Sequence, residues 1–224
     1  MKTLHYATPN ARGTEPALLV LLPGAGMVAE DFETHGFIAA VQRRPWRCDV
    51  LAVETGVATY LDDDIAERLH HEVIAPALGA GIEHLWLAGI SMGGFGALSY
   101  VKEYGAAVAR LLLLAPFIGS RGLIAQLEAA GGMQAWSRCN VVSATPQHRL
   151  LAWLASHDFA TGTGPTVHLG FGLQDRFAAA HGLLANMLPT ERVTTLNGGH
   201  DWPTWEVLWE HLLDNALRDL GGGA

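Results

Sequence analysis

The sequence predicts an α/β protein whose doubly wound, mostly parallel sheet carries helices on both faces. Apolar runs of strand length, such as residues 17–22 and 110–115, alternate along the chain with segments of helical period. Continuous apolar runs of this kind are typical of parallel strands buried on both faces. Hydrophobic residues make up 50% of the chain and charged residues only 16%, which suits a sheet covered on both sides. No internal repeat, linker or low-complexity tract divides the series, so we expect one domain over residues 1–224.

The expected elements follow from these runs and from the turn signals between them. We expect strands over residues 4–8 (at an edge), 17–22, 49–53, 85–89, 110–115, 166–171 and 193–196. We expect helices over residues 29–43, 60–78, 94–104, 121–130, 146–156, 177–188 and 203–220. Strand and helix alternate except between residues 117 and 164, where two helices occur with no evident strand.

Charge and cysteine content argue against several classes of function. The formal net charge of -8 disfavours nucleic acid and anionic membranes as partners. Cys48 and Cys139 provide neither a disulfide framework nor metal-ligand spacing, so we expect two free thiols. The amino end lacks a charged-then-apolar signal pattern, and residues 17–22 are too few to span a bilayer. We therefore expect a cytoplasmic protein without integral membrane association.

Residues 85–94 are the most informative stretch. An apolar strand pattern leads into Gly-Ile-Ser-Met-Gly at residues 89–93, and a small-residue helical pattern follows at once. A serine between a strand and a helix in Gly-x-Ser-x-Gly is the context of a nucleophile elbow. The turn needs small residues on either side of the serine, because side chains at Gly89 and Gly93 would collide with neighbouring backbone. We predict that Ser91 is a nucleophile lying at the carboxyl edge of the sheet.

Two further loops at that edge carry the partners that a serine nucleophile needs. Asp175 follows the strand expected over residues 166–171, and His200 follows the strand expected over 193–196. We predict His200 as the base and Asp175 as the acid, in the chain order Ser, Asp, His of α/β-hydrolases. Asp158 and Asp201 are the alternatives for the acid. Asp158 lies in the irregular segment, and Asp201 adjoins the histidine too closely to turn onto the same ring.

The glycine-rich loop after the strand of residues 17–22 is a candidate oxyanion loop. Its sequence, Pro-Gly-Ala-Gly-Met at residues 23–27, is compatible with a tight turn between strand and helix. Because an elbow serine follows downstream, we favour a loop whose backbone N–H faces a substrate oxygen. We predict the N–H groups of Ala25 and Met92 as the oxyanion donors. Gly26 is the second choice for the loop donor and a candidate substrate contact.

The chain resembles serine esterases of the α/β-hydrolase fold, in particular the group of small esterases that includes esterase D and antigen 85-like proteins. The segments Gly-Ile-Ser-Met-Gly-Gly at 89–94 and Gly-His-Asp-Trp at 199–202 carry the resemblance, and the order of elements extends it over nearly the whole chain. The resemblance implies a Ser–His–Asp triad that hydrolyses carboxylic esters or thioesters without a cofactor. The chain departs from many relatives at residues 23–25, where they have His-Gly before the oxyanion residue.

The segment of residues 117–164 is a candidate lid or pocket wall, because functional insertions commonly follow strand ends. The alternative is that its helices simply cover the sheet. Phe117 and Trp136 are large apolar side chains in this segment, and we predict that both contact substrate. Trp202 is a further candidate because it lies close to His200 in the sequence.

The predicted function is hydrolysis of small-molecule esters or thioesters through an acyl-enzyme on Ser91. An acyltransferase with the same triad is the first alternative. A non-catalytic receptor or scaffold is the second, and the joint presence of Ser91, Asp175 and His200 argues against it. We expect no cofactor and no metal, because the histidines and cysteines show no ligand spacing.

Overall fold

Seven strands form a sheet in the order β1-β3-β2-β4-β5-β6-β7 in the computed structural model, which describes residues 1–8, 16–79, 82–139, 145–159 and 164–221. β1 pairs antiparallel with β3 at one edge, and every other neighbouring pair is parallel. The predicted α/β class is therefore confirmed. The strands are β1 (Thr3–Tyr6), β2 (Ala17–Leu22), β3 (Cys48–Val53), β4 (His84–Ile90), β5 (Val108–Leu114), β6 (Thr166–Gly172) and β7 (Val193–Leu196).

The central strands are apolar on both faces because both faces are covered. Every residue of β2 is buried, and all of β4 is buried after its first residue. Leu22 at the end of β2 pairs with Gly89, and Ile90 at the end of β4 pairs with Leu114. The carboxyl ends of these strands therefore meet at the same edge of the sheet, where loops of parallel sheets collect reactive groups.

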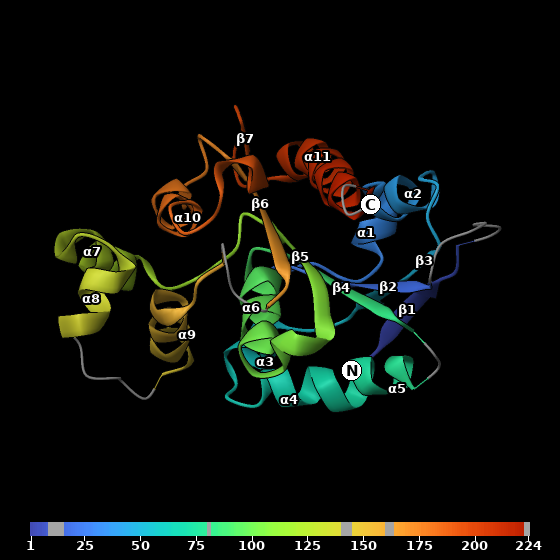
Figure 1. Ribbon diagram of the computed structural model, residues 1–224, viewed down its shortest axis with the longest axis horizontal. Helices are drawn as coiled ribbons and strands as arrows, with labels where there is room; N and C mark the ends of the chain where they lie inside the picture. The colour runs from blue at the N-terminus through green and yellow to red at the C-terminus, as the bar shows by residue number, and fades with distance from the viewer. Residues whose placement is uncertain (9–15, 80–81, 140–144, 160–163, 222–224) are drawn as a thin grey trace.

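Helices cover the sheet in two layers (Figure 1). α11 packs on β5, β6 and β7 and contacts α2, whereas α6 packs on β2, β4 and β5 from the opposite face and contacts α3 and α4. The helices outside residues 115–165 are α1 (Asp31–Thr34), α2 (Phe37–Gln42), α3 (Val57–Leu61), α4 (Ile65–Leu69), the π-helix η1 (His70–Ile74), α5 (Ala75–Leu78), α6 (Met92–Tyr104), α10 (Ala178–Ala185) and α11 (Trp202–Gly221), with short 3-10 turns η2 (Gly105–Ala107) and η3 (Thr190–Arg192).

Two of the predicted helices are interrupted. The helix expected over residues 29–43 breaks between α1 and α2 at Gly36, whose φ of 74° lies in the left-handed region. The helix expected over 60–78 becomes α3, α4, η1 and α5. Its π-helical turn lies just before Pro76, which has no N–H to donate and whose ring would clash with a carbonyl in the preceding turn. Continuous apolar periodicity does not reveal breaks of this kind.

The segment after β5 is helical, as predicted, but contains an additional helix. α7 (Arg121–Ala130) and α9 (Pro146–Ser156) have the predicted bounds, and α8 (Met133–Cys139) lies between them. Gly131 and Gly132 separate α7 from α8 at φ values of 86° and 114°. Figure 1 shows α7 and α8 at the edge of the molecule, beyond α9. Residues 140–144 and 160–163 of the candidate lid lie outside the described residues.

Two expectations from composition can be compared with the described part of the chain. Cys48 is a free, buried thiol whose pKa is raised far above its usual value by burial, whereas the side chain of Cys139 is not described. Within the described ranges, no helix combines the length and the apolar character needed to cross a bilayer.

Candidate active site

The turn between β4 and α6 has the strained geometry of a nucleophile elbow. Ser91 has φ 51° and ψ -112°, a backbone conformation that residues other than glycine rarely adopt. A Cβ at Gly89 would lie 2.3 Å from the carbonyl oxygen of Gly93, and a Cβ at Gly93 would lie 2.0 Å from that of Leu22. Both contacts are far shorter than any real Cβ makes, so the close packing of β2, β4 and α6 requires the two glycines.

Backbone hydrogen bonds from the neighbouring strand stabilise this turn. Ser91 N–H donates to the carbonyl oxygen of Leu114 at 3.0 Å, and its own carbonyl oxygen accepts from Phe117 N–H at 2.8 Å. Gly94 N–H also donates to Ser91 O, at 3.0 Å. The turn at Ser91 and the start of the segment of residues 117–164 are therefore bonded directly to each other.

The three predicted triad side chains lie in one line of hydrogen bonds. His200 Nδ1 is 2.7 Å from Asp175 Oδ2, and His200 Nε2 is 3.0 Å from Ser91 Oγ. An ionised carboxylate only accepts, so Nδ1 carries the proton and Nε2 is free to accept from the serine hydroxyl. The rings of Phe177 and Trp205 pack edge-on against the imidazole, each with its centroid 5.0 Å from that of His200.

The loops that carry the acid and the histidine are joined to each other. Leu173 N–H donates to the carbonyl oxygen of Leu196 at 2.9 Å, and Gln174 N–H donates to that of Gly198 at 3.0 Å. A Cβ at Gly172 would stand 2.2 Å from Gly198 O, so this approach requires a glycine. Backbone contacts therefore hold the loops of Asp175 and His200 together.

Asp175 is a buried acid that remains ionised. Its side chain has 0% exposure. Burial acts to raise its pKa, but the hydrogen bonds from His200 and from Phe177 N–H, 2.8 Å from Oδ1, outweigh burial, and the pKa is lowered.

The two alternative acids are occupied elsewhere. Asp201 is exposed, and its Oδ1 accepts from Thr204 N–H at 3.1 Å, which caps the first turn of α11. Asp158 is exposed beyond the end of α9, where its charge acts on His157. Neither carboxylate is hydrogen-bonded to His200.

The loop after β2 forms a turn closed by a bond from Met27 N–H to Gly24 O at 3.3 Å, with Gly26 at φ 75°. The Met27 thioether accepts from Gly24 N–H, at 3.0 Å from nitrogen to sulfur. Among the described residues, the N–H groups of Ala25 and Gly26 have no acceptor. Met92 is the first residue of α6, so its N–H has no acceptor within the helix. Donor capacity for an oxyanion is therefore available in the loop after β2 and at the start of α6.

The candidate substrate contacts differ in their surroundings. Phe117 is half-buried, and its backbone N–H donates to the carbonyl oxygen of Ser91. Trp136 has an exposure of only 3% and lies 6.0 Å from the ring of His148 on α9. Trp202 stacks on His35 at 3.9 Å. The packing of both tryptophans is accounted for by neighbouring side chains, and their contact with substrate stays a prediction, as does that of Gly26.

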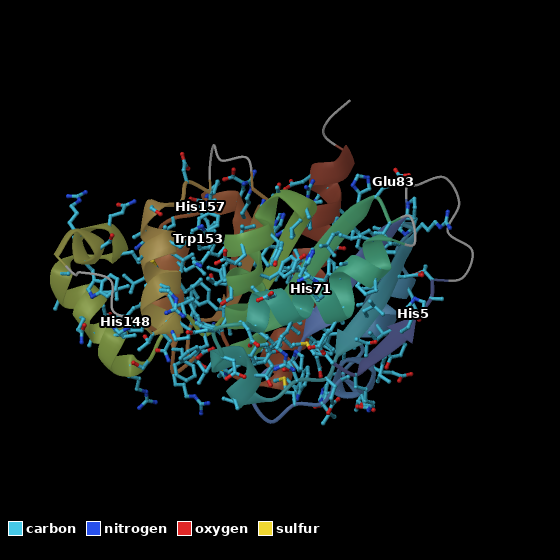
Figure 2. All side chains as sticks on the ribbon, turned by 90° about the horizontal axis from the view of Figure 1, so that it is seen from below. His5, His71, Glu83, His148, Trp153 and His157 are labelled. Atoms are coloured by element: carbon cyan, nitrogen blue, oxygen red, sulfur yellow. The ribbon has the colours of Figure 1, made fainter. Side chains whose placement is uncertain are left out.

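His200 is distinguished from the other ten of the eleven histidines by its neighbours. His5, His71, His148 and His157 lie at separate places around the molecule (Figure 2). His181, which sequence reasoning missed, lies beside Asp175. No motif marks it, although its place in the helix that follows the acid could have suggested proximity. No group of three or more histidine, cysteine or acidic side chains among the described residues could hold a metal ion.

The fold is similar to that of several solved structures. FphF, a fluorophosphonate-binding serine hydrolase of Staphylococcus aureus, matches with a TM-score of 0.61 and 15% identity over 96% of this chain and 97% of its own. Peroxisomal α/β-hydrolase Lpx1 of Saccharomyces cerevisiae matches with a TM-score of 0.65 and 13% identity over 98% and 82% of the two chains. The enol-lactonase of Burkholderia xenovorans matches with a TM-score of 0.60 and 17% identity over 96% of each. No protein-family model and no curated protein matches the sequence. At these identities the comparisons show the fold alone.

Proposed function

Because the chain has the α/β-hydrolase fold, we propose that it is a serine hydrolase that cleaves carboxylic esters or thioesters of small molecules. The continuous line of hydrogen bonds from Ser91 through His200 to Asp175 carries this proposal. A fold alone does not imply an activity. A strained serine, an accepting imidazole and a buried carboxylate at one sheet edge are, however, the parts that acyl transfer needs.

The reaction proceeds through an acyl-enzyme. Ser91 Oγ attacks the acyl carbon while His200 Nε2 takes its proton, and the carbonyl oxygen becomes an oxyanion. The intermediate collapses, and the leaving alcohol or thiol takes the proton from His200. A water then attacks the acyl-enzyme, gives its proton to His200, and releases the acid, and Ser91 recovers its proton. Asp175 stabilises the imidazolium throughout without accepting the proton.

The oxyanion is stabilised by the N–H groups of Ala25 and Met92. Their freedom from other acceptors supports this role, whereas Gly24 N–H is engaged by the Met27 sulfur. Each donor of this kind typically lowers the barrier by about 3 kcal/mol. The reaction as written needs only this chain, substrate and water. As a separate proposal, we place the protein in the cytoplasm.

Labelling with a fluorophosphonate tests the proposal. The reagent should modify one site per chain, at Ser91, and a p-nitrophenyl ester should show a burst of p-nitrophenol as the acyl-enzyme forms. Ser91→Ala should abolish both signals while the fold persists. Labelling that continues in Ser91→Ala would assign the nucleophile to another residue. Product analysis with added alcohol distinguishes hydrolysis from acyl transfer, the alternative that uses the same triad.

A further inference from the structure

A second imidazole approaches the acid of the triad. His181 on α10 has a side-chain exposure of 0%, and its Nδ1 lies 4.0 Å from Asp175 Oδ2. The same oxygen faces His200 Nδ1 at 2.7 Å. The ring of His181 also packs against that of Phe171 with centroids 5.2 Å apart. Two imidazoles therefore converge on one carboxylate oxygen, and the proposed reaction uses only one of them.

The buried carboxylate has capacity for a further polar neighbour. Asp175 Oδ1 accepts from Phe177 N–H and Oδ2 from His200. An ionised carboxylate offers about four lone-pair sites, so these two bonds leave part of its capacity unused in a site with no exposure. A neutral imidazole beside Oδ2 adds a polar group to this environment without adding a second cation.

His181 is held neutral at ordinary pH. Burial lowers its pKa to about 4, although the Asp175 charge opposes this effect. Among the other groups that face the ring, His200 lowers the pKa further, whereas the carbonyl groups of Ala115 and Pro116 act to raise it. Neutrality matters here because a charged His181 would compete with His200 for the same anion.

Packing alone does not explain a histidine at this position. The carbonyl groups of Ala115 and Pro116 approach the ring of His181, but neither ring nitrogen makes a hydrogen bond of normal geometry to another described residue. A buried polar group that is poorly hydrogen-bonded typically costs about 1–3 kcal/mol, and a leucine would fill similar space without that cost. The nearest charged atom is the oxygen that receives His200.

We propose that His181 is a positioning residue, whose ring holds the Asp175 carboxylate in the orientation that receives His200. This inference rests on the proposed function. It predicts that loss of the ring's polarity slows the chemical step, because the imidazolium of His200 would then meet a less well-placed anion. Substrate binding should change little, because His181 is buried behind the acid.

Three variants test the proposal, each assayed on a p-nitrophenyl ester. His181→Leu should lower kcat by about 10- to 100-fold, the loss typical of a small misplacement in an active site. KM should stay within about twofold of the parent value, since the contacts that bind the substrate are unchanged. His181→Asn should retain most of the activity because its amide nitrogen can stand near the position of Nδ1. His181→Gln, whose amide stands nearer the position of Nε2, should retain less. Unchanged kcat in His181→Leu would overturn the proposal.

A double-mutant cycle with Asp175→Asn separates positioning from plain structural support. If His181 acts through Asp175, His181→Leu should have almost no effect on the residual activity of Asp175→Asn. An effect of the same size in both backgrounds would overturn the proposal. If His181→Leu fails to fold, the asparagine and glutamine variants carry the test, and equal kcat values for the two would overturn it. Loss of the proposed function itself is recognised separately, because Ser91→Ala would then retain activity.

Discussion

At the scale of single residues, the site depends on glycine positions where even a Cβ atom would collide with the backbone. Ser91 is strained, and the strain is maintained by hydrogen bonds to Leu114 and Phe117 and by close contacts at Gly89 and Gly93. Strain of this kind persists only where the surrounding structure over-determines it. Glycines at close contacts should therefore be much less replaceable than glycines at exposed turns.

We expect Gly93→Ala to abolish ester hydrolysis and to destabilise the fold, because its Cβ would stand 2.0 Å from the carbonyl oxygen of Leu22. Gly26→Ala meets no atom within 4 Å but has φ 75°, so it should fold at a cost of about 1–2 kcal/mol. Gly122→Ala, inside α7 with open space around it, is the control and should be neutral or stabilising. Thermal unfolding and esterase assays check all three. An active Gly93→Ala would contradict this reading of the elbow.

We expect Asp175→Asn to lower kcat/KM by about 10³- to 10⁴-fold, because the amide can donate to the ring and favour the wrong tautomer. Asp201→Asn should keep activity, because asparagine also caps a helix. Asp158→Asn should do likewise. If Asp158→Asn were the crippling change, the acid would have been assigned to the wrong loop.

At the scale of elements, prediction succeeded where one local pattern decides the outcome. The strand of residues 17–22 and the helix of 121–130 have the predicted bounds because an apolar run or an amphipathic pattern ends at a clear turn. The break at Gly36 and the π-helical turn before Pro76 depend on packing and backbone geometry, which periodicity does not encode. The joint placement of Ser91, Asp175 and His200 was predictable because parallel strands bring their carboxyl ends together. His181 was missed because its role depends on which face of α10 meets the acid.

Within residues 117–164, the burial of Trp136 shifts the expected effect of its truncation from substrate profile to stability. If Trp136 were mainly a substrate contact, as the sequence predicts, Trp136→Ala would alter the substrate profile more than stability. Trp136 on α8 is 3% exposed and packs toward α9, so its truncation should lower the free energy of unfolding by about 3–5 kcal/mol.

Phe117→Ala should instead shift the acyl-chain preference, because the backbone of Phe117 is bonded to Ser91. A graded series of p-nitrophenyl esters and denaturant unfolding measure the two effects. An unchanged preference in Phe117→Ala would favour the alternative that residues 117–164 simply cover the sheet.

At the scale of the whole molecule, acid sensitivity should come largely from neutral histidines in the interior. His168 in β6 is 1% exposed and lies 3.3 Å from Asp219 of α11. Burial lowers the pKa of His168 to about 4, although Asp219 opposes this effect, and burial lowers the pKa of His181 to a similar value. In the unfolded chain both rings should have a pKa of about 6.5. Between these values the unfolded state binds more protons than the native state, so stability falls as pH falls.

The stabilisation from each of these histidines should be complete above about pH 6.5 and lost progressively down to about pH 4, at a slope of up to about 1.4 kcal/mol per pH unit. His168→Leu removes one titrating group, so its free energy of unfolding should decline less steeply than the parent's over this window. His71→Gln is the control, because that side chain is 66% exposed and its environment changes little on unfolding. The stability that comes from the ionised Asp175 carboxylate should be lost only at lower pH, since the pKa of that group is lowered in the native state. Urea unfolding at half-unit pH steps measures the slopes. Parallel curves for the parent and His168→Leu would show that β6 contributes nothing to acid sensitivity.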